Sequence, residues 1–516
     1  MSTLIISHLN DSQPPRFEVQ RHEDGKKSPP VEITSPVGFP VDGSGNVELM
    51  GETRWYLEQF LDYPFPPATE RAERAVAALK RWGEHAFDAL FKTVPGAVWY
   101  DKAITEGAQN LQIFVSSDDP RIMAWPWEAL HDPQRGFLAL QRHLERKLNS
   151  PADPPPLPDL PKDRVNVLLI VARPFQNDVR YGSIARPLVD LIGSQHLPAE
   201  VTVLRPPTLD RLREHLRERP DYYHILHFDG HGAYCDSNVP TAPGPYTMQA
   251  PQGHLVFEKD DGQPEPIDGD KISQLLREFR IPAVILNACQ SAMVDARAEG
   301  PFASVATSLL RAGVRSVVAM AYSVSVSGAQ KLLPTFYRRL FETGQLTEAN
   351  RAGRQEMFRD PGRVCARETF PLQDWLVPVM YQQNPIDFGF AAKARETAPK
   401  NKSDRLPPEA RDDANPYGFV GRDGAILELE RAMRRPPAGI LVHGLGGVGK
   451  TTLARGFVRW LEQTGGLTAG CLWLTFNDIR SGEYVLNTIG TALFGPDFLT
   501  VELRNYADHR IMRSSR

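Results

Sequence analysis

The sequence predicts a protein of the α/β class, built on a doubly wound, mainly parallel sheet and followed by a partial P-loop α/β domain. Three observations support this prediction. Continuous apolar runs, such as residues 165–172, are typical of strands that are buried on both faces. Such runs alternate with helical patterns between residues 165 and 342. A complete phosphate-binding motif stands at residues 444–451.

The composition indicates a globular chain in a reducing compartment. Its 516 residues are enough for two or three domains, and 41% hydrophobic and 24% charged residues exclude a disordered or fibrous protein. With 59 basic and 63 acidic residues, there is no basic excess for nucleic acid or anionic membranes. The four cysteines show no metal-ligand or disulfide spacing, and no signal peptide or membrane span is apparent. We therefore expect a cytoplasmic protein without nucleic-acid or membrane partners.

The N-terminal part is predicted to be irregular before helical order begins. Residues 1–68 are rich in Pro and Gly and hold only short strand-like pieces, so we expect a separate region rich in β-structure and loops. Apolar residues at helical spacing predict a helix over 69–91, and a strand is expected at 111–117. Residues 151–161 carry six prolines in eleven positions, which indicates an extended connector.

After the connector, strands and helices alternate. The expected strands are 165–172, 201–205, 222–228, 254–258, 283–288 and 316–322, and the expected helices lie near 184–193, 208–218, 270–279, 302–312 and 328–342. A Gly- and Pro-rich insert occupies 232–253. This order is typical of a parallel sheet with helices on both faces, and we assign 69–390 to one domain.

A charged linker follows this domain. Of residues 391–413, eleven are charged and none is aromatic, so the stretch 391–415 is expected to be flexible and to separate a further domain at 416–516. This linker would bring copies of the first domain together if the second domain self-associates.

The string GLGGVGKT, with a strand expected before it at the apolar run 439–443 and a helical pattern after it, predicts a nucleotide-binding loop. Glycine backbone N–H groups can surround phosphate oxygens at a helix N-terminus. Lys450 would reach the β- and γ-phosphates, and the Thr451 hydroxyl would ligate Mg²⁺. The predicted ligand is ATP or ADP with Mg²⁺, and the predicted binding residues are Gly444, Gly446, Gly447, Gly449, Lys450, Thr451 and Thr452.

The segment FVGRDGAILELERAM together with GILVHGLGGVGKTTLA resembles the start of the nucleotide-binding domain of STAND NTPases, the NB-ARC- and NACHT-like switches. The resemblance covers about 416–480 and implies a switch that is truncated before the Walker B aspartates. One further strand is expected at 471–476, and no later apolar strand ends in acidic residues. We therefore expect nucleotide binding with little hydrolysis.

A second set of residues suggests catalysis. The strings YYHILHFDGHG and AVILNACQSA each join a predicted buried strand to a small-residue turn, with His231 just past one strand and Cys289 just past the other. Sites in open α/β sheets form at the carboxyl ends of the strands. A His can lower the pKa of a thiol and later protonate a leaving amine. The N–H groups of Gly232 and Cys289 would form an oxyanion hole.

These strings, together with WPWEALHDPQRGFLAL, GHLVFEKDDG, AGVRSVVAMAYSVS and QDWLVPVMY, resemble the CHAT domain over about residues 70–390. CHAT domains belong to the caspase-like, clan CD cysteine peptidases. The resemblance implies peptide-bond hydrolysis by His231 and Cys289, with Gly232 as oxyanion donor and no cofactor for the peptidase.

Substrate preference is less readable. Metacaspase-like relatives carry an acid two positions before the nucleophile, and here that residue is Asn287, so a basic P1 residue is not indicated. Asp229 is an alternative pocket acid, although an Asp in such a turn is commonly structural.

Other eye-catching residues have structural interpretations. His224 and His227 face opposite sides of a strand, so they do not ligate a metal together and are expected to pack. Trp125, Trp127 and Glu128 are expected to wedge the preceding region against the sheet rather than to contact substrate.

The functional hypothesis is a signal-gated cysteine endopeptidase of bacterial defence or programmed cell death. It would cleave a protein substrate under the control of the attached nucleotide-binding switch. Two alternatives stay open: a catalytically silent CHAT-fold adaptor, and a nucleotide-binding (ATP/ADP) regulatory protein. Covalent labelling of Cys289 by a peptide ketone would separate the peptidase from the adaptor.

Overall fold

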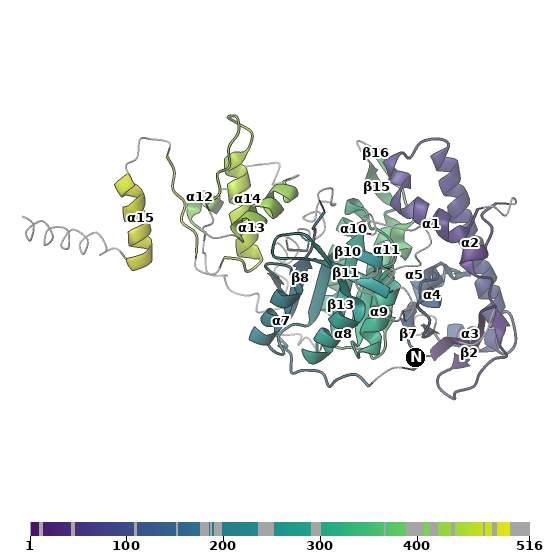
Figure 1. The fold of residues 1–516 in the computed structure, drawn as a ribbon. Coiled ribbons are helices and arrows are strands. Elements are labelled where there is room, and N and C mark those ends of the chain that lie inside the picture. The colour runs from purple at the N-terminus through teal and green to yellow at the C-terminus, as the bar shows by residue number, and fades with distance from the viewer. Residues whose placement is uncertain are drawn as a thin grey trace, which may run out of the picture. The chain divides into compact units, whose positions relative to one another are not determined.

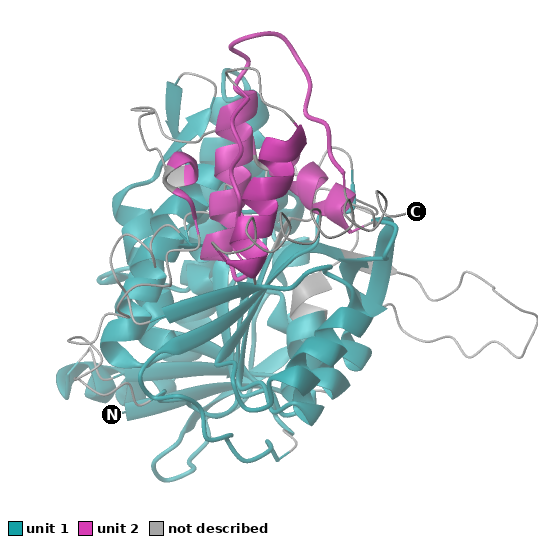
Figure 2. Ribbon diagram, turned by 90° about the vertical axis from the view of Figure 1, so that its left-hand side faces the viewer, with its two compact units in different colours: residues 1–399 teal, residues 400–516 magenta. Residues whose placement is uncertain are grey.

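The structure is a computed structural model. It describes residues 2–9, 14–42, 47–107, 111–150, 153–175, 185, 188–189, 199–235, 252–289, 301–365, 368–388, 406–411, 422–434, 439–467, 470–476 and 482–495. The chain divides into two compact units, residues 1–399 and 400–516, which Figure 2 shows in different colours. Each unit is described by itself.

The first part of unit 1 contains strands that join the central sheet (Figure 1). Its elements are β1 (Ser2–Leu9), β2 (Arg16–Arg21), β3 (Val31–Glu32), η1 (Pro36–Gly38), α1 (Leu49–Glu58), η2 (Phe60–Asp62), α2 (Ala68–Phe91), α3 (Gly96–Thr105), β4 (Leu111–Ser116), α4 (Pro120–Met123), η4 (Trp127–Ala129), β5 (His131–Asp132), β6 (Gly136–Phe137), α5 (Leu138–Gln141) and β7 (His143–Lys147). Although the sequence predicts a separate region at residues 1–68, β1 pairs in parallel with β4 and buries Leu4, Ile5 and Ile6. Burial of these apolar side chains ties the segment to the sheet.

The second part of unit 1 carries the strand–helix alternation that the sequence predicts. Its elements are β8 (Val165–Val171), β9 (Ala199–Val203), α7 (Leu209–Glu218), β10 (Ile225–Cys235), β11 (Gln252–Glu258), β12 (Pro264–Asp268), α8 (Gly269–Glu278), β13 (Ala283–Cys289), α9 (Pro301–Arg311), β14 (Ser316–Met320), α10 (Val326–Thr343), α11 (Leu346–Arg359), β15 (Gly362–Cys365), β16 (Glu368–Pro371), η5 (Asp374–Leu376) and β17 (Pro378–Gln382). The helix expected at 184–193 lies almost wholly outside the described residues.

A single mixed sheet of 13 described strands runs through unit 1. One path through it is β9-β8-β10-β13-β14-β17-β7-β4-β1-β2-β3, with β11 and β12 attached to the far half of β10. Strands β9, β8, β10, β13 and β14 are mutually parallel, and β7, β4 and β1 form a second parallel group. Strand β17 joins the two groups, antiparallel to β14 and parallel to β7. The α/β class and the mainly parallel sheet are thus as predicted.

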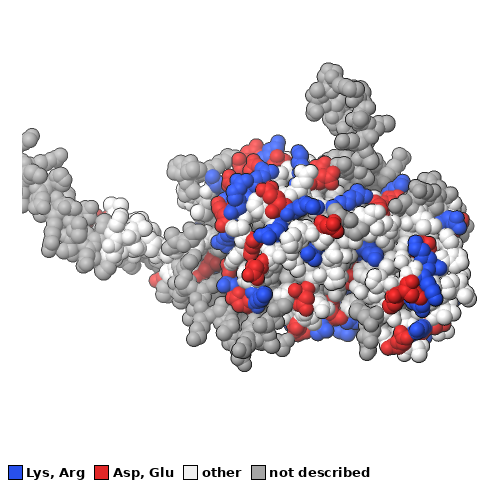
Figure 3. All heavy atoms as spheres, turned by 90° about the horizontal axis from the view of Figure 1, so that it is seen from below, with Lys and Arg blue, Asp and Glu red and all other residues white. Residues whose placement is uncertain are grey.

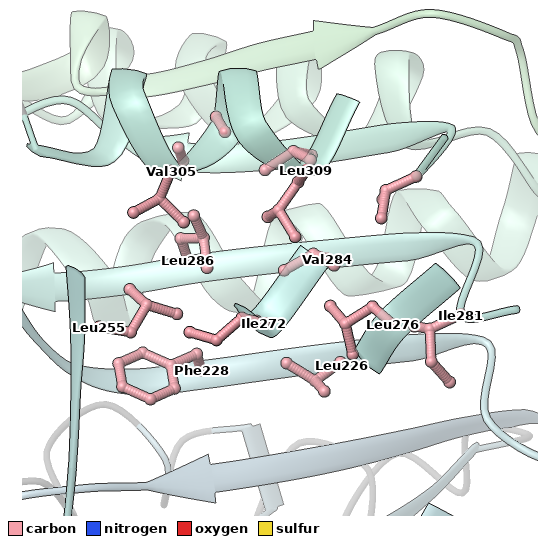
Figure 4. Packing of buried hydrophobic residues seen from close by; sticks show 14 of the residues in the cluster. Leu226, Phe228, Leu255, Ile272, Leu276, Ile281, Val284, Leu286, Val305 and Leu309 are labelled. Carbon is pink, nitrogen blue, oxygen red and sulfur yellow. The ribbon is translucent and has the colours of Figure 1, made fainter. Parts of the chain in front are cut away.

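Alternation along the central strands separates an apolar face from a more polar one. Leu226 and Phe228 of β10, with Val284 and Leu286 of β13, pack against helices α8 and α9 in one buried cluster (Figure 4). The intervening His227 lies on the opposite face, where its Nδ1 is 3.0 Å from the Tyr337 hydroxyl of α10. Because side chains alternate in a strand, Asp229 and His231 share this second face with His227.

Polar side chains begin several of these helices. Thr208 accepts a hydrogen bond from the Arg211 N–H at the start of α7, and Asp268 accepts from Asp270 at the start of α8. Ser325 caps α10 in the same way. Such caps satisfy N–H groups that have no partner within the helix.

A buried ionic cluster joins the two groups of strands. Glu128, in η4, accepts hydrogen bonds from Arg146 of β7 at 2.6 Å and from Arg354 of α11 at 2.9 Å, and all three side chains are buried. Trp127 beside it is fully buried and donates to the Ile122 carbonyl. These contacts agree with the predicted wedge between the N-terminal region and the sheet.

Unit 2 is described as helices α12 (Pro408–Arg411), α13 (Asp423–Met433), α14 (Lys450–Gln463) and α15 (Gly482–Phe494). The strands expected at 439–443 and 471–476 do not form in the described residues. Leu441 is 84% exposed and Phe476 is 60% exposed. A parallel strand needs neighbours that satisfy its backbone and cover its side chains, and the described part of unit 2 offers none. A P-loop α/β domain is therefore not seen.

Among the described residues, no helix combines the length and the apolar character needed to cross a membrane.

Candidate active site

Strand β10 changes its neighbour on one side at Gly230. Residues 225–229 pair with β8 in parallel register, whereas residues 231–235 pair with β11 in antiparallel register. On the other side, β13 accompanies β10 from residue 225 to residue 231. A fork thus opens where β8 ends, at the edge of the sheet where open α/β folds form their sites.

Gly230 stands at this fork because the chain after β8 passes directly over it. The Ala172 N–H donates to the Asp229 carbonyl at 2.9 Å. A Cβ at position 230 would lie 2.9 Å from the Ala172 carbonyl oxygen and 2.6 Å from the Phe228 ring. Only glycine accommodates this approach without displacing the backbone, which gives a physical reason for the first glycine of the DGHG string.

The strand register brings His231 and Cys289 together. Cys289 is the last residue of β13, and its Cα partner on β10 is His231. Adjacent strands are about 4.8 Å apart, so the two residues are backbone neighbours. The side chain of Cys289 lies outside the described part of the structure. The sequence predicts His231 just past the end of its strand. The residue instead lies within β10, because β11 extends the pairing to Cys235.

The described surroundings of His231 are mainly apolar. Its side chain is 2% exposed, and the edge of the Phe175 ring meets the imidazole with 5.0 Å between ring centroids. Across the antiparallel pair, His231 faces Val256 of β11, and Gly232 faces Leu255. Gly232, the predicted oxyanion donor, thus lies inside the ladder between β10 and β11.

Asp229 and Asn287, which lie two residues before His231 and Cys289 on their strands, are also register partners. The Asp229 carboxylate is fully buried and forms an ion pair with the guanidinium of Arg173. A buried, paired carboxylate does not face substrate, so the interpretation of Asp229 as a pocket acid is wrong and its structural interpretation holds. The Asn287 side chain is also buried.

The other histidines near the site belong to the core. Burial lowers the pKa of His227 to about 4, and burial lowers the pKa of His224 to about 4 despite its bond to the Pro161 carbonyl. His224 also accepts the Asn166 N–H at 3.0 Å. Both imidazoles are therefore neutral at physiological pH, as expected for packing residues.

Sequence reasoning missed three residues around the fork. Arg173 and Phe175 follow β8, and Glu258 ends β11; Glu258 accepts the Arg173 N–H at 3.1 Å and is fully buried. A charged residue directly after a continuous apolar strand, as in the string IVARPF, is the signal that could have drawn attention to Arg173.

The phosphate-binding motif forms a loop at the start of α14. Gly444, Gly447 and Gly449 have φ of 154°, 78° and 87°, a conformation that favours glycine. The Lys450 ammonium donates to the carbonyl oxygens of Gly444 at 2.9 Å and Leu445 at 2.8 Å, so the side chain folds back over the loop.

The remaining predicted nucleotide-binding residues are Gly446, which is exposed in the loop, and Thr451 and Thr452, which are exposed in the first turn of α14. Arg422, which precedes α13, donates to the Val448 carbonyl at 2.6 Å. The structure thus places the predicted residues around one loop, and their binding of Mg²⁺ and nucleotide stays a prediction.

Charges are mixed on the surface. On the face that Figure 3 shows, Lys and Arg side chains are interspersed with Asp and Glu, without a broad patch of one sign.

Comparisons with known proteins place this geometry in context. The model of the CHAT domain family matches residues 80–400. No curated protein sequence matches the chain. Two solved structures of the Saccharomyces cerevisiae separase–securin complex are similar at 13% and 15% identity, with TM-scores of 0.31 and 0.29, over 63% and 64% of this chain. A structure described only as a protease is similar at 11% identity, with a TM-score of 0.35, over 60% of this chain and 69% of its own. The chain spans 20% of each separase chain.

Proposed function

Because the chain belongs to the CHAT-domain family of caspase-like peptidases, we propose that it is a cysteine endopeptidase that cleaves a protein substrate with His231 and Cys289. The observation that carries the proposal is the register of β10 and β13, which makes these two residues Cα partners at the carboxyl edge of the sheet.

The proposed reaction follows from the chemistry of the two side chains. His231 takes the Cys289 proton, and the thiolate sulfur bonds to the substrate carbonyl carbon. The C–N bond then breaks as the imidazolium gives its proton to the leaving amine. Water, deprotonated by His231, next attacks the thioester, releasing a carboxylic acid and restoring the thiol. Backbone N–H groups at Gly232 and Cys289 would hold the oxyanion.

A covalent probe tests this proposal without a known substrate. A library of peptidyl acyloxymethyl ketones with varied P1 residues is incubated with the chain, and modified peptides are identified by mass spectrometry. We expect labelling at Cys289 that His231→Ala suppresses. Comparison of new protein N-termini in cells carrying the wild type or Cys289→Ala would then identify the substrate. Labelling of Cys365 or Cys471 alone would contradict the proposal.

The adaptor alternative makes the opposite prediction. A silent CHAT fold would keep partner binding when Cys289 is replaced and would show no His231-dependent labelling. The register of β10 and β13 favours the enzyme, because a binding face does not require a histidine opposite a cysteine.

A second function, nucleotide binding in unit 2, is favoured by the loop at 444–449. Its three glycines with positive φ and the Lys450 ammonium stand at the start of a 14-residue helix, a setting suited to phosphate. Titration with fluorescent ATP and ADP, with and without Mg²⁺, tests it. Binding that Thr451→Ala makes independent of Mg²⁺ would support the assigned metal ligand, and absence of binding would remove the function.

We further propose that unit 2 gates the peptidase, in bacterial defence or programmed cell death, through self-association. The joining of a peptidase unit and a phosphate-binding loop in one chain supports this proposal. Peptide cleavage by residues 1–516, by residues 1–415 and by a 1–415 chain fused to an inducible dimeriser should rise only in the forced dimer. High and equal activity in all three would mean an ungated enzyme.

A further inference from the structure

The segment that follows β8 is fastened to the strand that carries His231. Its first residue, Ala172, donates to the Asp229 carbonyl, and the Arg173 guanidinium pairs with the Asp229 carboxylate. The Arg173 N–H donates to Glu258 at 3.1 Å, which ties the same segment to β11. Arg173, Asp229 and Glu258 are all fully buried. These three contacts therefore join the segment after β8 to both β10 and β11 at the level of Gly230.

Stability alone is a poor explanation for the ion pair. Removing two charges from water offsets much of their attraction, and a buried pair is often replaceable by apolar residues without loss of stability. Its position is informative instead. Asp229 forms the last register pair between β10 and β8, with Val171, and His231 is the first residue that pairs with β11.

Phe175 connects this fastening to the imidazole. It stands two residues beyond Arg173, and its ring meets His231 edge to face, with 5.0 Å between centroids and 79° between planes. On its two strand edges His231 is bounded by β13 and β11. The position of the Phe175 ring thus limits the orientations that the imidazole can adopt. The bonds of the segment after β8 in turn fix the position of Phe175.

We propose that the Arg173–Asp229 ion pair, acting through Phe175, is a positioning element that holds the His231 imidazole in the orientation that pairs with Cys289. The inference rests on the proposed dyad and extends it to the chain after β8. We assign neither member of the pair a contact with substrate, because their charged groups pair with each other. The role is to keep one ring orientation populated, which is what an ion pair between a thiolate and an imidazolium requires.

The reactivity of Cys289 toward iodoacetamide measures this orientation directly. A thiolate paired with an imidazolium reacts below pH 7, whereas an ordinary thiol with a pKa near 8.5 loses about tenfold in thiolate for each pH unit below that value. Rates are followed from pH 5 to pH 9 with the whole chain, and the modified cysteine is identified in peptides by mass spectrometry. No substrate is needed.

The test variant is Arg173→Met with Asp229→Val, which removes both charges together so that neither is left buried alone. We expect its Cys289 alkylation at pH 6 to fall about tenfold relative to the wild type, with equal rates at pH 9, where every thiol is largely ionised. The matched control is Arg363→Met with Asp374→Val. Arg363 and Asp374 form a second fully buried ion pair in unit 1, outside the fork. We expect the control to keep the wild-type profile.

Phe175→Leu provides a second route that leaves the ion pair intact. It should also lower the alkylation rate at pH 6, but by a smaller factor. This effect can be measured whether or not the double variant folds. Equal profiles for wild type, the test variant and Phe175→Leu would overturn the inference, as would an equal loss in the Arg363/Asp374 control. His231→Ala separates this result from the dyad itself. If His231→Ala also leaves the profile unchanged, the proposed dyad fails and the positioning role falls with it.

Discussion

The sequence predicts a strand followed by a turn both at the carboxyl edge of the sheet in unit 1 and at the phosphate-binding loop of unit 2. Among the described residues, only the motif of unit 1 contains formed strands. In unit 1, Val284 and Leu286 precede Cys289 in a strand paired on both sides and are almost completely buried. In unit 2, Leu441 precedes the glycine loop in an unpaired segment and is 84% exposed. The loop of unit 2 adopts its turn nonetheless. Local glycine and helix-start chemistry therefore shapes a loop by itself, whereas an apolar run becomes a strand only when neighbours cover it.

The largest expected effect concerns the dyad, which depends on the paired strands. Cys289→Ala and His231→Ala should each reduce kcat/KM on the cleaved peptide by at least about a thousandfold, and the double variant should be no worse than either, because the two groups act as one unit. Steady-state kinetics on the three variants, with circular dichroism as a control for folding, measure this. Additive losses would mean that the residues work independently.

The same substitution, Leu to Ala, should have different effects on stability in the two regions, because the two leucines differ in burial. Leu286→Ala removes a fully buried side chain of β13 from the cluster that packs against α8 and α9, and it should lower the free energy of unfolding of unit 1 by about 3 kcal/mol. Leu441→Ala, at an exposed position, should change stability by less than about 0.5 kcal/mol. Urea unfolding of each variant measures both values. A comparable cost at Leu441 would show that the segment is covered in solution.

The loop of unit 2 should show its function in binding rather than in stability. Lys450→Ala removes a cation next to the expected phosphates and should weaken nucleotide binding by roughly tenfold to a hundredfold, the range for a hydrogen bond to a charged group. Isothermal titration with ATP measures it, and Lys450→Arg, which keeps the charge, serves as control. Unchanged affinity in Lys450→Ala would mean that nucleotide binds elsewhere or not at all.

A smaller, pH-dependent effect is expected where polar groups are enclosed by the sheet. Burial raises the pKa of Glu145 on β7 to about 8, and its Oε2 accepts from Gln112 of β4 and Gln382 of β17. The unfolded chain releases this proton near the ordinary pKa of 4.5 and the folded chain only near 8. Stability contributed by the neutral form therefore falls as pH rises from about 4.5 to 8.

Glu145→Gln removes this ionisable group, so the free energy of unfolding should fall less as pH rises. The variant should gain about 1–2 kcal/mol relative to wild type between pH 5 and pH 8, as judged by urea midpoints at each pH. Parallel curves for the two proteins would show that Glu145 is ionised in the folded chain.

Much of unit 1 follows from its sequence. The runs at 165–172 and 283–288 are apolar except for one asparagine each, as is typical of a strand covered on both faces, and both form where expected. The placement of His231 and Cys289 near the carboxyl ends of two strands also follows from the two strings, but the adjacency of these strands does not. Their direct register does not, because register is set by the packing of whole strands and not by the residues at one position.

Other features depended on partners that the local sequence does not name. The local sequence leaves Asp229 open as a pocket acid because Arg173, which neutralises it, lies 56 positions earlier in the chain. It also separates β1 from the sheet because the partner strand β4 follows more than a hundred residues later. The strand expected at 439–443 failed for the converse reason, since its apolar pattern lacks a described neighbour.

The ionic cluster around Glu128 makes the proline-rich connector a natural place to divide the protein. A break in the connector would leave Glu128 and Arg146 in one fragment and Arg354, with strand β17, in the other. The second fragment alone would hold Arg354 without its carboxylate partner, and each fragment would expose a strand edge, at β7 in the first and at β17 in the second, so neither should settle into a folded state by itself. Brought together by fused binding partners, they should complement each other, so that the proposed cleavage would report that two other proteins have met.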